Sequence, residues 1–97
     1  MNRELAKELS TYAVNKYGAD FEIDRCIEEM SELTKALLKD RRDSSYDAIE
    51  DILYELGDVL FTLTHIQTAY EIEDKFIDDM FNKSMNRFRY EEKLYEQ

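Results

Sequence analysis

The chain has 97 residues, which is enough for one domain, and 23 Asp and Glu against 13 Lys and Arg give a formal net charge of −10. This balance excludes ordinary nucleic-acid binding, which needs a basic surface, but it permits a small polyanionic substrate if a metal ion bridges the two. Two Gly and no Pro favour long uninterrupted helices. The single Cys cannot form an internal disulfide, and no apolar run reaches signal-peptide or membrane-span length. We therefore expect a cytoplasmic protein.

Apolar residues recur at spacings of three and four in four segments, and each segment is predicted to be helical. Gly18 stands where a helix C-cap is expected, and Asp20 can cap the second segment. Ser44 or Ser45 can cap the third. The predicted helices cover residues 2–17, residues from about 20 to a charged connection at 40–43, residues from 44 or 45 to about 70, and residues from about 74 onward.

These amphipathic helices with short connections predict a single all-α domain over residues 1–97 with the architecture of a four-helix bundle. The second helix would direct Ile23, Met30 and Leu37 into the core, and the third would direct Leu56 and Leu63 there. A domain of this size buries only roughly 60–65% of its unfolded surface, so association with another subunit would help to stabilise it.

Acidic residues gather on the side of each central helix that lies opposite its apolar stripe. They form two groups of three carboxylates, Glu28, Glu29 and Glu32 in the second helix and Asp51, Glu55 and Asp58 in the third. One interpretation is that both groups are ordinary solvated faces. The other is a metal site, because like charges four residues apart cost a few tenths of a kcal/mol unless a cation lies among them. Mg²⁺ and Mn²⁺ prefer carboxylate oxygens.

Glu28-Glu29-Met30-Ser31-Glu32, followed after 22 residues by Glu55-Leu56-Gly57-Asp58, resembles the EExxE…ExxD signature of MazG-type nucleotide pyrophosphohydrolases. These enzymes belong to the all-α NTP pyrophosphatase superfamily, and the resemblance covers about residues 20–89. It implies Mg²⁺-dependent cleavage of a nucleoside triphosphate between its α and β phosphates, giving a monophosphate and pyrophosphate, with Mn²⁺ as a substitute ion. It further implies house-cleaning of non-standard nucleotides and assembly into a homo-oligomer, either a dimer or a tetramer.

The resemblance also assigns roles to the acidic residues. By position, Glu29, Glu32, Glu55 and Asp58 would be the metal ligands. Glu28 would be a further ligand, or the carboxylate that orients and deprotonates the attacking water. All five would therefore belong to the catalytic site.

Basic residues in the last helix are candidates for holding the substrate phosphates, as in similar family members. Lys83 and Arg87 are four residues apart on one face, with Asn82 beside them. Arg89 could take the role of Arg87. The alternative is that the Lys and Arg pair is solvated and offsets the acidic surface.

Three further residues carry expectations. His65 is either a proton shuttle or, as we expect, a hydrogen-bonded structural histidine. Gly57 inside a helix suggests the close approach of a neighbouring helix or ligand. Cys26 lies on the apolar face and is expected to be buried. The sequence shows no Ser-His-Asp arrangement, no phosphate-binding glycine loop and no zinc-type cluster.

The rival hypothesis is a non-catalytic acidic helical protein that acts as an interaction module or regulator. A third is a nucleotide sensor that keeps the metal site and has lost turnover. Neither the preferred base and sugar nor the number of metal ions follows from the sequence.

Overall fold

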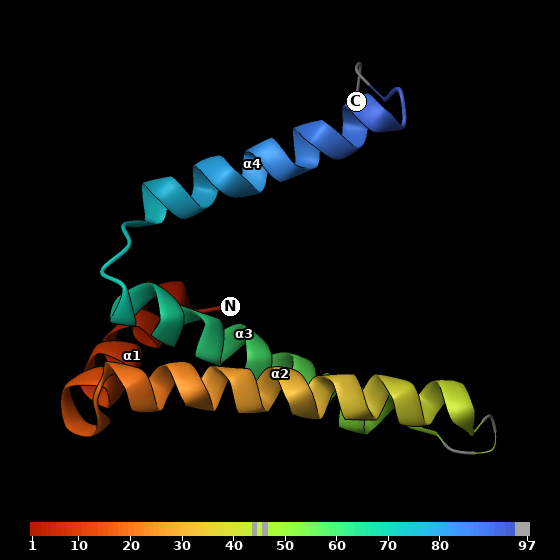
Figure 1. The fold of residues 1–97 in the computed structure, drawn as a ribbon, viewed down its shortest axis with the longest axis horizontal. Coiled ribbons are helices and arrows are strands. Elements are labelled where there is room, and N and C mark those ends of the chain that lie inside the picture. Colours follow the sequence, from red (N-terminus) through yellow and green to blue (C-terminus); the bar gives the residue numbers. More distant parts are fainter. Residues whose placement is uncertain (44, 46, 95–97) are drawn as a thin grey trace.

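The computed structural model describes residues 1–43, 45 and 47–94, and these form four α-helices and no strand. The helices are α1 (Arg3–Tyr17), α2 (Ala19–Arg42), α3 (Ile49–Ala69) and α4 (Asp74–Glu91) (Figure 1). The prediction of an all-α fold is therefore confirmed. Within the described part of the chain, no helix has the length and apolar character needed to cross a membrane.

The first two helices meet at Gly18. Its φ of 95° lies in the region that favours glycine, and its N–H donates to the carbonyl of Val14 at 2.9 Å, which closes α1. The same residue is the N-cap of α2, so Asp20 lies inside the first turn and does not cap it. The predicted charged connection begins later than expected, because α2 continues through Arg42, and basic side chains in its last turn interact favourably with the helix dipole.

The third helix begins and ends with backbone geometry that the sequence did not indicate. Its N-cap is Ala48, while the Ser45 hydroxyl hydrogen-bonds Asp43 at 2.6 Å; Ser44 lies outside the described residues. At its C-terminus, Glu71 has a φ of 54° and its N–H donates to the carbonyl of Thr68, while the Ile72 N–H donates to that of Gln67. This is a Schellman motif with Glu in the left-handed position where Gly is preferred.

Helices α1, α2 and α3 pack on one another, and α4 stands away from them (Figure 1). Near its start, α4 is tied to α1 by Asp74, which accepts a hydrogen bond from Lys7 at 2.8 Å and pairs with Arg3 at 3.5 Å. The radius of gyration is 16.4 Å, against about 13 Å for a compact domain of this length. The expected four-helix bundle is thus replaced by three packed helices and an extended fourth, because the apolar side of α4 finds no partner among the residues that the structure describes.

The buried centre of the described chain is small and unexpectedly polar. Its most completely buried side chains include His65, Glu22, Cys26 and Ser10, each less than 2% exposed. By contrast, Met30 and Leu56 are each 41% exposed, although the helical pattern predicts them in the core. Apart from Cys26, which is buried, the expected core stripes of α2 and α3 therefore lie largely on the surface of the described chain, because α4 does not cover them.

Candidate metal centre

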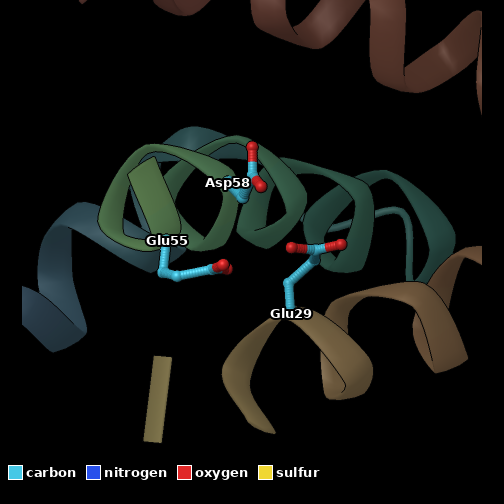
Figure 2. Close-up of side chains that lie close together, drawn as sticks. All are labelled: Glu29, Glu55 and Asp58. Atoms are coloured by element: carbon cyan, nitrogen blue, oxygen red, sulfur yellow. The ribbon is translucent and has the colours of Figure 1, made fainter. Parts of the chain in front are cut away.

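Three carboxylates from two helices converge at one point. Glu29 on α2 points toward α3, where Glu55 and Asp58 lie on one side three residues apart (Figure 2). One ligand oxygen of each lies within 4.8 Å of those of the other two. The short connection after α2 makes α2 and α3 antiparallel, and this brings together residues far apart in the sequence (Figure 1).

The cluster is an uncompensated concentration of negative charge. Removal from water raises the pKa of Glu29 above its ordinary value of 4.5, and the charges of Asp58, Glu55 and Glu28 raise it further. Loss of water contact and the charge of Asp58 likewise raise the pKa of Glu55. No Lys or Arg of the described chain forms an ion pair with any of the three cluster carboxylates. Such a donor set favours a hard divalent cation.

The other two acids of the motif lie at the margin of the cluster. Glu28 is exposed, yet its charge contributes to the raised pKa of Glu29. Glu32 is half-buried, pairs with Lys35 at 3.4 Å, and contributes to the raised pKa of Glu55. The structure therefore gathers three of the five motif acids closely and keeps two within electrostatic reach.

The basic residues predicted to hold phosphates lie on α4. Asn82, Lys83 and Arg87 are all exposed, and Lys83 pairs with Asp79 at 3.1 Å. Since α4 stands away from α2 and α3, the single chain does not bring these residues to the carboxylates (Figure 1). Arg89, the alternative to Arg87, donates from Nε to the carbonyl of Leu94 at 3.1 Å and so closes the end of its own helix.

The interpretation of His65 as a structural histidine is supported by its surroundings. It is 1% exposed, with Nδ1 2.7 Å from the Ser10 hydroxyl and Nε2 3.4 Å from a carboxylate oxygen of Glu22. This Ser–His–Glu series was not anticipated, because its members come from three helices. Ser10 is completely buried, so its hydroxyl cannot reach a substrate as a nucleophile.

Two smaller expectations have opposite outcomes. Cys26 is completely buried, as predicted from its place on α2. A Cβ added to Gly57 would meet no atom within 4 Å, so the close approach expected there does not occur within the single chain.

A family model described as the MazG nucleotide pyrophosphohydrolase domain matches residues 21–93. The chain belongs to the MazG nucleotide pyrophosphohydrolase family. The match spans α2, α3 and α4 and therefore includes the carboxylate cluster, which fits the use of a divalent metal in the MazG family. Comparison with curated proteins and with solved structures gave no match. Membership of this family supports a hydrolase activity, nucleotide pyrophosphohydrolysis in general.

Proposed function

We propose that this MazG-family protein is a Mg²⁺-dependent nucleoside triphosphate pyrophosphohydrolase, with Mn²⁺ as a substitute ion. It would cleave the bond between the α and β phosphates of a (d)NTP to give a monophosphate and pyrophosphate, and its role would be the removal of non-standard nucleotides. The observation that carries this proposal is the convergence of Glu29 with Glu55 and Asp58 within 4.8 Å, in a chain that matches the family model across all three residues.

The residues fit a Mg²⁺ site by the chemistry of their donors. Glu29, Glu55 and Asp58 offer carboxylate oxygens on two helices that hold them rigidly, and the charge of Glu32 acts on Glu55 from the margin of the cluster. Bound Mg²⁺ would neutralise phosphate charge and lower the pKa of a coordinated water. Glu28, exposed beside Glu29, would orient the attacking water and accept its proton.

A second copy of the chain is part of this proposal. Large apolar side chains remain exposed along α2, α3 and α4, and a stable monomer rarely leaves so much apolar surface in water. Examples are Leu38 at 52%, Leu53 at 60% and Phe81 at 64% exposure. We propose that the copies associate through these faces and that α4 of one chain brings Lys83 and Arg87 to the carboxylates of the other.

Pyrophosphate release from a panel of canonical and modified (d)NTPs with Mg²⁺ tests the activity. We expect turnover of at least one substrate, and its loss in Glu29→Ala and in Asp58→Ala. Asp24→Ala is the matched control, because Asp24 is an exposed acid on α2 outside the cluster. Silence across the panel would favour the acidic interaction protein, whereas equal turnover in all variants would place the active site elsewhere.

Mixing inactive variants tests the contribution of a second copy. Asp58→Ala lacks a metal ligand, and the double variant Lys83→Ala/Arg87→Ala lacks the phosphate contacts. If the two groups act across an interface, subunit exchange creates one complete site, and the mixture regains activity that neither variant has alone. A mixture that stays inactive, although mass measurement shows mixed oligomers, would contradict the shared site.

A further inference from the structure

We infer that Glu22 and His65 are positioning residues, which fix the register of α2 against α3 so that Glu29 faces Glu55 and Asp58. The inference deepens the proposed function and rests on it, because the carboxylates that it aligns are the proposed metal ligands. Neither residue belongs to the acidic motif.

The pairs Glu22–His65 and Glu29–Asp58 form in the same register of α2 against α3. Glu29 lies seven residues after Glu22 on α2, and Asp58 lies seven residues before His65 on α3. Seven residues are almost two helical turns, or about 10.5 Å along each axis, so each residue shares a face with its counterpart. Because the helices are antiparallel, the placement that brings Glu22 to His65 also brings Glu29 to Asp58 (Figures 1 and 2).

Because Glu22 and His65 are buried, their contact favours one position of α2 along α3 over the others. The Glu22 side chain is completely buried, and neither of its carboxylate oxygens accepts a hydrogen bond within the described chain. The charge that compensates it is the Arg25 guanidinium, whose Nε lies 3.4 Å from one carboxylate oxygen, and the polar Nε2 of His65 lies 3.4 Å from the same oxygen. A buried carboxylate that loses such a partner is strongly destabilising, so placements that separate Glu22 from His65 are disfavoured.

The partners of this pair are themselves fixed. The Arg25 guanidinium lies over the rings of Tyr17 and Phe21, 5.5 and 5.1 Å from their centroids. On the other side, Ser10 of α1 contacts His65 Nδ1 at 2.7 Å, so α1 also holds the imidazole in place. A neutral imidazole with its proton on Nε2 directs that proton to Glu22 and accepts from Ser10. The pair therefore joins all three packed helices.

The rest of the buried interface between α2 and α3 is not selective in this way. The other buried side chains of the two helices, Cys26, Val59 and Thr62, are small, and the Thr62 hydroxyl donates to the carbonyl of Asp58 on its own helix. Apolar contact of this kind has no preferred direction. A slip of one turn, about 5.4 Å, would keep apolar contact while separating Glu22 from His65 and Glu29 from Asp58.

The deciding variant is Glu22→Leu/His65→Leu, which replaces the polar pair with apolar residues of similar size. Such replacements often preserve stability, so we expect the helix content to remain. Mn²⁺ affinity, measured by electron paramagnetic resonance of the free ion, should fall about 10-fold or more. A folded double variant that binds Mn²⁺ as tightly as the wild type would overturn the inference.

If the double variant does not fold, two single variants decide. Glu22→Gln keeps the reach of the side chain and an oxygen for His65 but removes the charge, whereas Glu22→Asp keeps the charge and shortens the side chain. A role in register predicts that Mn²⁺ affinity is retained in Glu22→Gln and reduced in Glu22→Asp. The reverse order, or wild-type affinity in Glu22→Asp, would refute it.

The same titration separates this inference from the proposed function. If the wild type binds Mn²⁺ but releases pyrophosphate from no nucleotide, the proposed activity is refuted. The Mn²⁺ affinities of the variants can still be compared, so the role in register is still tested. Turnover by the wild type together with unchanged Mn²⁺ affinity in the folded double variant would refute only the role in register.

Discussion

Replacing Asp58 by Asn should affect the stability of this protein in opposite directions with and without metal. The substitution preserves shape and removes one of three negative charges whose oxygens lie within 4.8 Å of one another. Two unit charges at that separation repel by about 0.9 kcal/mol even at the dielectric constant of water, which suits side chains that are only partly buried. Asp58 has two such neighbours, Glu29 and Glu55, so without metal the variant should be more stable than the wild type by about 1–2 kcal/mol.

With Mg²⁺ present, the order should reverse. A bound ion stabilises the folded state by RT ln(1 + [L]/Kd), about 2.7 kcal/mol at a hundred times Kd, and a protein that has lost a ligand does not gain this. Urea denaturation followed by circular dichroism, in EDTA and in saturating Mg²⁺, measures both effects. Asp24→Asn is the matched control, since it removes one exposed charge from α2 outside the cluster. The reasoning is refuted if Asp58→Asn is less stable than the wild type in EDTA, or if Mg²⁺ raises its free energy of unfolding as much as it raises that of the wild type.

Three further predictions concern protons and backbone geometry. Because the pKa values of Glu29 and Glu55 lie above 4.5, Mn²⁺ affinity should be lost as the pH falls through the raised values, with a midpoint above 4.5. Over the same fall in pH, the metal-free protein should gain stability, because the folded state binds more protons than the unfolded state; a titration with its midpoint at or below 4.5 would contradict both statements. Glu71→Gly should stabilise the protein by about 0.5–1 kcal/mol in urea denaturation, because φ at this position is 54°. Glu73→Gly, at a φ of −73°, is its control and should bring no gain. Hydrogen bonds from Lys7 and Gln67 hold the pKa of Asp74 below its ordinary value of 3.8, so their stabilisation is complete above that pH and is lost as the pH falls below it. Asp74→Asn should therefore be less stable than the wild type at neutral pH and should approach it in acid; a constant difference across that range would show that the charge is not the cause.

The helices were predictable because their signals are local. Spacings of three and four placed all four of them, and the start of α4 at Asp74 agrees with the sequence-based expectation. Helix boundaries that depend on backbone geometry were harder to predict from the sequence. Ala is a poor N-cap residue, so residue preference pointed to Ser44 or Ser45 and not to Ala48. Glu is likewise disfavoured in the left-handed conformation that Glu71 adopts.

The acidic motif was also visible in the sequence. Which of its acids form the close cluster and which lie at the margin was not. Helical spacing places Glu55 and Asp58 on one side of α3 whatever the tertiary structure. Spacing alone does not say which of Glu28, Glu29 and Glu32 meets them, because that depends on the rotation and register of α2 against α3. The structure selects Glu29.

Local physics therefore determined the all-α class, the places of the helices and the presence of a carboxylate-rich stripe on each central helix. Long-range packing decided which stripes meet, and it left the predicted apolar core of α2 and α3 largely exposed. It also buried Glu22 against His65, although nothing in the local pattern distinguishes this acid from its solvated neighbours. Periodicity fixes the direction of a side chain around its own helix axis, whereas burial depends on which other helix covers that side, and only the tertiary structure supplies the second helix.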